Sequence, residues 1–102
     1  MDQLRVRAML SDRAIFQHED LIRRHQRDKV LSIWSAGCSS GEEPYNITMY
    51  LFDYLGAQAR QWDTRILATD ISANALASAK KGIYELPETM PTDWKRKYFT
   101  KN

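Results

Sequence analysis

The alternation of apolar and polar residues predicts two short buried strands, each followed by a helix. Val30–Trp34 is an apolar, branched run bounded by charged residues and by glycine, which is typical of a buried parallel strand. Arg65–Thr69 is a second run of this kind. From Glu43 to Leu55 the apolar positions follow helical spacing, and Gly56 suits the C-cap of that helix. The central part of the chain therefore predicts strand, helix, strand.

A third element of the same series follows the second strand. Ser72 is a favourable N-cap for a helix over Ala73–Lys81, and Gly82 is a favourable residue to end it. The strand–helix–strand unit predicts a right-handed crossover, which brings the turns after both strands to one edge of the sheet. In open α/β sheets that carboxyl edge is where ligands bind.

The two ends of the chain carry weaker signals. From Ser11 and Asp12, which are candidate N-caps, the pattern predicts a helix with one side formed by Ile15, Phe16, Leu21, Ile22 and His25. Residues 83–102 are less regular, because Pro87 and Pro91 interrupt them, and Thr92 is a candidate cap for a short turn. We predict an α/β chain with a helical segment (1–29), a βαβα core (30–82) and an irregular tail (83–102).

Composition narrows the class without identifying it. The chain has 102 residues, enough for one domain, with 43% hydrophobic and 27% charged residues and a net charge of +2. This balance favours neither nucleic acid nor a membrane surface as a partner. The single cysteine, Cys38, excludes an intramolecular disulfide, and His18 and His25 lack the partners that a metal site needs. With no apolar membrane span and no signal-peptide pattern, we expect a cytoplasmic protein.

Candidate chemistry lies in the turn between the first strand and its helix. Its glycines allow a ligand to approach the backbone, and the helix N-terminus offers free N–H groups. The spacing matches neither common phosphate-binding pattern, and Glu42 and Glu43 would repel a phosphate. Asp70 ends the second strand, where a carboxylate typically binds ribose hydroxyls. Carboxylates on both turns suit a nucleoside with a cationic amino-acid tail and no phosphate, such as S-adenosylmethionine.

Structural roles could also explain each of these residues. The glycines serve any tight turn, Glu42 and Glu43 complement the helix dipole, and Asp70 suits the start of the next helix. All three at matching strand ends favour a shared ligand. We interpret Cys38 as a small packing residue and Trp34 as a core residue.

Two stretches of the chain are distinctive: IWSAGCSSGEEPYNITM, and ILATDIS followed by ALASAKKGIY. Together with a weaker match at Tyr98–Phe99, they resemble segments of the CheR-type chemotaxis receptor methyltransferases. The resemblance covers most of the chain and implies a partial Rossmann-like (class I) methyltransferase fold. It also implies S-adenosylmethionine as methyl donor, S-adenosylhomocysteine as product and receptor glutamates as the methylated groups.

The resemblance also implies roles for individual residues. Glu43 would contact the amino-acid end of the cofactor, Asp70 its ribose, and Ala36 and Gly37 would lie beside it through their backbone. Glu42 ranks below these as a neighbour of the site. No residue of the chain is identified as catalytic.

Two departures from the family pattern change the expectation. Where the family has an arginine that meets the cofactor carboxylate, this chain has Ser11, and the sequence leaves open whether Arg7 or Arg13 replaces it. The chain also supplies only two convincing strands, so we expect a piece of the domain whose unpaired sheet edges cause self-association. A module that binds cofactor or protein without catalysis is the alternative function.

Overall fold

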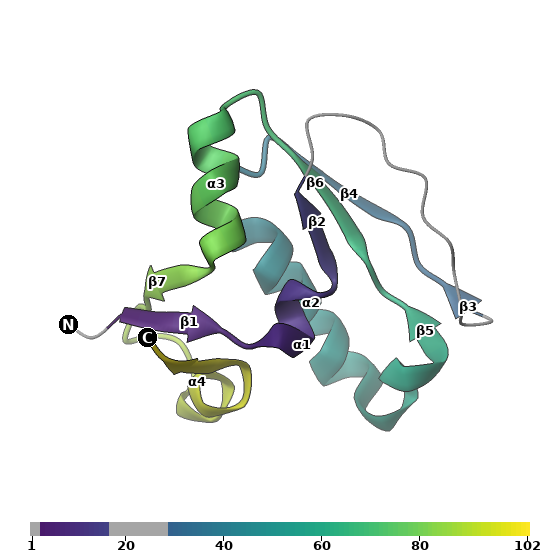
Figure 1. Ribbon diagram of the computed structural model, residues 1–102. Coiled ribbons are helices and arrows are strands. Elements are labelled where there is room, and N and C mark those ends of the chain that lie inside the picture. Colours follow the sequence, from purple (N-terminus) through teal and green to yellow (C-terminus); the bar gives the residue numbers. More distant parts are fainter. Residues whose placement is uncertain (1–2, 17–28) are drawn as a thin grey trace.

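The first sheet of the protein is parallel and has three strands. The computed structural model describes residues 3–16 and 29–102, and its parallel sheet has the order β2-β6-β4 (Figure 1). In this sheet Ala36 lies opposite Thr69, so β4 and β6 end at the same edge. The three strands are β2 (Ala14–Phe16), β6 (Ile66–Thr69) and β4 (Ile33–Ala36).

Helices follow β4 and β6 as the sequence predicts. α2 (Glu42–Leu55) begins after Gly41 and ends at Gly56, which donates its N–H to Phe52. α3 (Ala73–Lys81) is capped by the Ser72 side chain, which accepts a hydrogen bond from the Ala75 N–H, and it ends at left-handed Gly82. Between α2 and β6 lie a 3-10 helix, η1 (Gly56–Gln61), and β5 (Trp62–Asp63), which pairs in parallel with β3 (Lys29–Val30).

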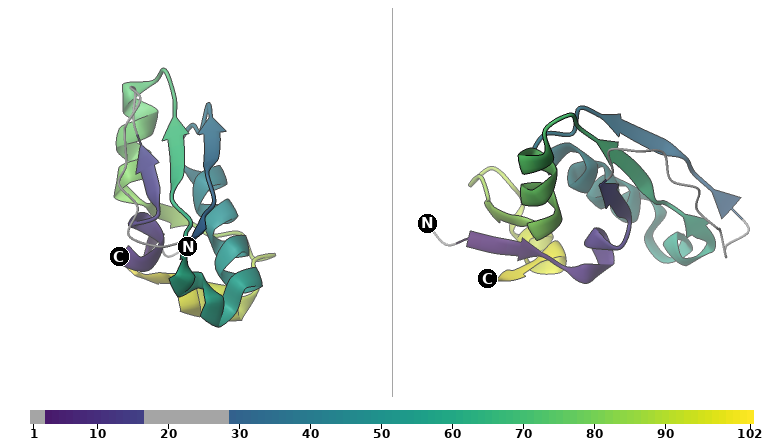
Figure 2. Two further views of the ribbon diagram at one scale, coloured as in Figure 1. Left: turned by 90° about the vertical axis from the view of Figure 1, so that its right-hand side faces the viewer. Right: turned by 45° about the horizontal axis from the view of Figure 1, so that its top comes forward.

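The second sheet is antiparallel and joins the two ends of the chain. β1 (Gln3–Val6) lies between β7 (Ile83–Glu85) and β8 (Phe99–Lys101). Leu4 is opposite Tyr84 on one side and Lys101 on the other. The short helices α1 (Ala8–Ser11) and α4 (Thr92–Tyr98) connect this sheet to the rest of the molecule (Figures 1 and 2).

One core joins the two sheets. Tyr45 of α2 is buried and donates its hydroxyl to the Ala79 carbonyl of α3 at 2.9 Å. Residues from β1, α1, β8, α2, β6 and α3 contribute to the same buried cluster, among them Val6, Leu10, Phe99, Tyr45, Met49, Ala68, Leu76 and Ala79. The two sheets are therefore parts of one packed unit.

The structure corrects the predictions for the first thirty residues. Ala14–Phe16, predicted to begin a helix, form a strand that pairs with β6, and Asp12 is the C-cap of α1 rather than an N-cap. Isolated strand and helix signals are hard to distinguish over so few apolar residues, and pairing with a long-range partner decides between them. The remainder of the predicted helix, including Leu21, Ile22 and His25, lies outside the described residues.

Three further predictions need correction. The strand predicted at Val30–Trp34 is divided between β3 and β4, and the predicted irregular tail contains β7, α4 and β8. Trp34 is not a core residue, because 67% of it is exposed, and its Nε1 donates to Thr69 Oγ1 at 2.9 Å.

Cys38 is buried, as expected of a packing residue. Among the helices of the described residues, none is long and apolar enough to cross a membrane.

Candidate functional site

The loop between β4 and α2 has an unusual backbone. Gly37, Ser39 and Gly41 all have positive φ angles, of 67°, 54° and 97°. The space that a side chain would have at Gly37 differs from the space at Gly41. A Cβ at Gly37 meets no atom within 4 Å, whereas one at Gly41 would lie 2.7 Å from the Ala79 Cβ and 2.8 Å from the Tyr84 hydroxyl. Gly41 is therefore required for packing against α3, while the backbone at Gly37 stays open to a ligand.

Asp70 holds this loop against the end of the neighbouring strand. Its Oδ2 accepts the Ser39 N–H and its Oδ1 accepts the Ser72 N–H, both at 2.8 Å, and Cys38 donates its N–H to the Thr69 carbonyl at 2.8 Å. The N–H groups of Ser72 and Ser39 lower the pKa of Asp70 below its ordinary value. Because an ionised carboxylate has about four acceptor positions, Asp70 can also accept hydrogen bonds from the hydroxyl groups of a ligand.

Glu43 is anchored to the end of β4. Its Oε1 accepts a hydrogen bond of 2.8 Å from the hydroxyl of Ser35, which is 1% exposed. The carboxylate lies in the first turn of α2, where the free N–H groups favour a negative charge. Since Ser35 occupies one acceptor position, the remaining oxygen of Glu43 is available to a cationic group.

Glu42 faces a different part of the molecule. Its Oε1 accepts a hydrogen bond from the Ser40 hydroxyl, and Glu42 is one of the residues that line a cavity between α2, α3 and β7. Glu43 is not among the residues that line this cavity. The two adjacent glutamates therefore contact different surroundings. Four predicted site residues lie together at the carboxyl edge of the parallel sheet: Ala36 at the end of β4, Gly37 in the following turn, Glu43 in the first turn of α2, and Asp70 directly after β6.

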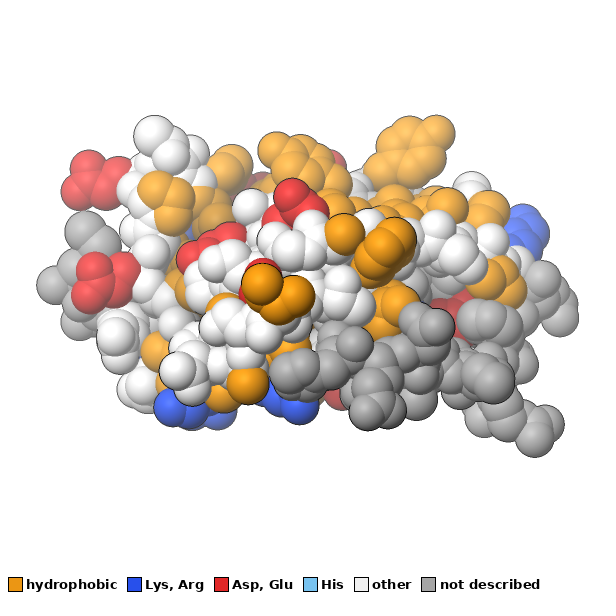
Figure 3. Space-filling model, turned by 90° about the horizontal axis from the view of Figure 1, so that it is seen from above, with side chains coloured by type: hydrophobic (Ala, Val, Ile, Leu, Met, Phe, Trp, Pro, Cys, Tyr) orange, Lys and Arg blue, Asp and Glu red, His pale blue; other side chains and the backbone are white. Residues whose placement is uncertain are grey.

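Negative charge dominates this edge. Burial raises the pKa of the Cys38 thiol, and the charges of Asp70 and Glu43 raise it further, so both carboxylates act on the same point of the loop. Seen from above, carboxylate side chains lie among hydrophobic and uncharged groups, and the basic side chains lie near the margin (Figure 3). This environment suits a cationic or hydroxyl-rich ligand better than a phosphate.

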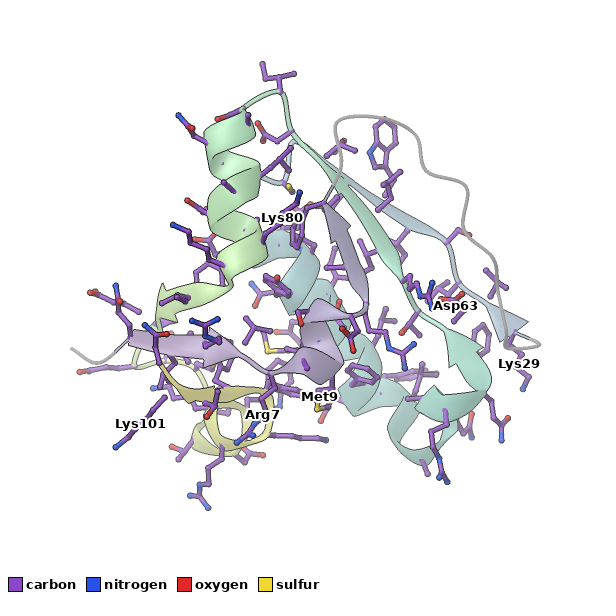
Figure 4. All side chains as sticks on the ribbon, in the orientation of Figure 1. Arg7, Met9, Lys29, Asp63, Lys80 and Lys101 are labelled. Carbon is purple, nitrogen blue, oxygen red and sulfur yellow. The ribbon has the colours of Figure 1, made fainter. Side chains whose placement is uncertain are left out.

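The two arginines considered as substitutes for a cofactor contact lie elsewhere. Arg7 donates from Nη2 to the Arg96 carbonyl at 3.2 Å and lies near β1 and α4, far from the loop after β6 (Figure 4). Arg13 lies with its guanidinium carbon 5.6 Å from the centre of the Phe52 ring, and Ser11 donates its hydroxyl to the Ala8 carbonyl. Neither arginine occupies the carboxyl edge of the parallel sheet.

Two contributors to the site were not identified from the sequence. Ser35 positions Glu43, and Ser39 adopts a positive φ that directs its N–H at Asp70. A serine within an apolar strand is a signal that could have indicated Ser35, because a buried hydroxyl needs a partner. No comparable signal exists for Ser39, since glycine, asparagine and aspartate are the residues that usually adopt positive φ.

The described residues contain no group of three or more His, Cys, Asp or Glu that is placed to bind a metal ion. His18 and His25 lie outside the described residues.

The chain is similar to one family model and to several curated proteins that are described as chemotaxis methyltransferases or as their domain. A family model described as "CheR methyltransferase, SAM binding domain" matches residues 7–102. The chain is 48% identical over 60 residues to a chemotaxis protein methyltransferase of Borreliella burgdorferi, covering 59% of this chain and 21% of the relative. It is 42% identical over 83 residues to chemotaxis protein methyltransferase 2 of Pseudomonas aeruginosa, covering 78% of this chain and 29% of the relative.

A third relative, the chemotaxis protein methyltransferase of Escherichia coli, is 39% identical over 87 residues, which are 80% of this chain and 29% of the relative. The chain thus spans between 21% and 29% of the length of these relatives. No solved structure matches the chain significantly.

Proposed function

Because the chain belongs to the CheR methyltransferase family, whose matched domain binds S-adenosylmethionine, we propose that it carries the first part of a cofactor site for methylating chemoreceptors. The acceptor is the side-chain carboxylate of receptor glutamates, and the fold is part of a Rossmann-like sheet. The single observation that carries this proposal is the pair of carboxylates that follow adjacent parallel strands: Glu43 in the first turn of α2, after β4, and Asp70 directly after β6.

Each residue has a distinct role in the proposed site. Glu43 binds the ammonium group of the cofactor, Asp70 accepts the ribose hydroxyls, and Ala36 and Gly37 give the ligand room to lie against the backbone. The open space at Gly37 and the unused acceptor positions of the two carboxylates support these roles. Glu42 stays a lower-ranked neighbour, because its carboxylate lines a separate cavity.

The chemistry asks little of the protein beyond positioning. The bound cofactor supplies an electrophilic methyl group. A glutamate acceptor has a reference pKa of about 4.3, so it is ionised at neutral pH and needs no general base. Glu43 and Asp70 fix the two ends of the site, and the acceptor must then be held in line with the methyl group. No catalytic residue is assigned within this chain.

Calorimetry with S-adenosylhomocysteine tests the cofactor site. We expect measurable binding that is weakened at least ten-fold by Glu43→Gln and by Asp70→Asn, since each removes a charged hydrogen bond of about 1.5–3 kcal/mol. Asp53→Asn is the matched control, because Asp53 is an exposed acid near the other end of α2. Binding that is unaffected by either site variant would contradict the proposal.

A separate assay distinguishes the enzyme from a module that only binds. Incubation with labelled S-adenosylmethionine and the cytoplasmic fragment of a chemoreceptor should give base-labile methyl esters on the receptor. Cofactor binding without such esters would assign the non-catalytic alternative to this chain. The proposal places the protein in the cytoplasm, with its substrate.

We also propose that the chain associates with itself through β4. In the described part of the chain, β4 pairs only with β6, and Trp34 on this strand is largely exposed. An open strand edge beside an exposed aromatic favours pairing with a second copy. Light scattering at micromolar concentration should give a mass above that of one chain, and a monomer would refute this part of the proposal.

A further inference from the structure

A cavity of about 440 Å³ borders the loop between β4 and α2, because Ser40 and Glu42 line it. It is formed by the first half of α2, the last half of α3, β7 and the segment 86–90. None of Ala36, Gly37, Glu43 and Asp70 lines it. A space of this size matches a small-molecule site or the side chain of a bound peptide.

Most of the cavity wall is apolar and adaptable. The apolar and aromatic lining residues are Tyr45, Met49, Ile83, Tyr84, Leu86, Pro87, Met90 and Phe99. Met90 is partly exposed, unbranched and flexible, so it can fit the shape of an inserted chain, while Met49 behind it is buried. The wall therefore favours an aliphatic group.

All the formal charge on the wall is negative. Glu42 and Glu85 line the cavity, and neither a lysine nor an arginine does. Both glutamates are exposed, so their carboxylates can meet a charge at the mouth of the cavity. The Tyr84 hydroxyl is already used, because it donates to the Ser40 carbonyl at 2.6 Å. A carboxylate or phosphate ligand would meet repulsion here and would find no compensating cation on the wall.

We propose that this cavity binds an aliphatic cation, which is an alkyl chain that ends in an ammonium or guanidinium group. The alkyl part contacts Ile83, Tyr84 and Met90, the apolar and aromatic lining residues that are only partly buried, while Glu42 and Glu85 neutralise the charge. Two sources share this chemistry: a lysine or arginine side chain of another protein, and a free polyamine. None of the residues assigned to direct cofactor contact lines this cavity, so its test uses the protein without cofactor.

Methyl NMR of methionine-labelled protein gives a direct readout. Hexylammonium should shift the signals of Met49 and Met90 to saturation and leave that of Met9, in α1 and outside the cavity, unchanged. Hexanol keeps the alkyl chain without the charge and should bind more weakly, and hexanoate should bind most weakly. Equal binding of hexanoate and hexylammonium would overturn the proposal.

Charge variants test the assigned carboxylates. We expect Glu42→Gln and Glu85→Gln each to weaken hexylammonium about 1.5- to 5-fold, the range for exposed ion pairs. Glu88→Gln removes a nearby exposed acid that does not line the cavity, so it should have no effect. If neither Glu42→Gln nor Glu85→Gln weakened hexylammonium binding, the site would also be refuted. The affinities of spermidine and of a short lysine peptide are then compared. Tighter binding of spermidine would assign the site to a free polyamine, and tighter binding of the peptide would assign it to a protein side chain.

Discussion

The two three-stranded sheets of this protein differ in how their strands are brought together. The parallel strands β4 and β6 are joined through α2, so neighbours in the sheet are also successive in the βαβ unit. The antiparallel sheet places β1 between two strands from the opposite end of the chain. The first sheet presents backbone groups and carboxylates at one edge, and the second closes an apolar cavity. The proposed cofactor edge is therefore built by two strands that follow each other through one crossover, whereas the antiparallel sheet needs strands from opposite ends of the chain.

The largest effect should come from the residue that links the two regions. Leu10 is fully buried in α1, between the antiparallel sheet and α2. We expect Leu10→Ala to lower the free energy of unfolding by about 2–5 kcal/mol, through lost burial and a cavity. Urea unfolding followed by far-UV and near-UV circular dichroism measures this loss.

Met9→Ala is the matched control, because the adjacent Met9 is 41% exposed and should change stability by no more than about 0.5 kcal/mol. Coincident transitions by both probes would show that the sheets unfold together. Separate transitions in Leu10→Ala would break the comparison, because the regions would then be independent.

The next effect should separate two glycines of the same loop. Gly41→Ala forces a side chain into a left-handed conformation and against Ala79, at a cost of about 2–4 kcal/mol in unfolding free energy. Gly37→Ala has the backbone cost alone, about 1–2 kcal/mol, because no atom lies within 4 Å of its Cβ. Thermal or urea unfolding compares them, and equal losses would contradict the packing role of Gly41.

A smaller effect should follow from the cap of α3. Ser72→Ala removes the hydrogen bond from the Ala75 N–H and should cost about 1 kcal/mol of unfolding free energy. Thr92→Ala is the control at the start of α4, where no side chain caps the helix, and it should cost no more than about 0.5 kcal/mol. If the two variants lost equal stability, the capping bond would contribute nothing measurable.

The smallest effect concerns pH. The pKa of Asp70 is lower in the folded protein than its ordinary value, because the N–H groups of Ser72 and Ser39 favour the carboxylate. Such a group stabilises the fold above its unfolded pKa, and that contribution is lost as pH falls through the folded pKa. Below about pH 4, the wild type should therefore lose more stability than Asp70→Asn, measured by urea unfolding across a pH series. Parallel pH profiles would show that Asp70 does not fix the loop.

The helix ends and the ends of the paired parallel strands could be predicted from the sequence. Gly56, Ser72 and Gly82 sit at helix ends as expected, because caps are set by the local backbone. The strand ends at Ala36 and Thr69 also meet as expected, because parallel pairing aligns them. The roles of the proposed site residues stay predictions that the binding experiments test.

The rest could not be predicted because its partners are distant in sequence. Gln3–Val6 alternates polar and apolar residues over only four positions, and its strand forms against residues beyond Gly82. Trp34 looked like core because it follows branched residues, but its side chain lies on the sheet face away from buried Ser35. Burial on one face cannot be read from a run of only a few apolar residues.

The pairing of β1 with β8 has a mechanical consequence. Asn102 donates its N–H to the Gln3 carbonyl, and the Arg5 guanidinium donates to the Asn102 side chain, so the ends of the described chain are fastened together. Because both ends lie at the same end of the β1–β8 pair, a force that pulled them apart would break the hydrogen bonds between these strands one after another. It would not load all of these bonds at once. The antiparallel sheet would open at low force, and the loop around Asp70 would bear load only afterwards.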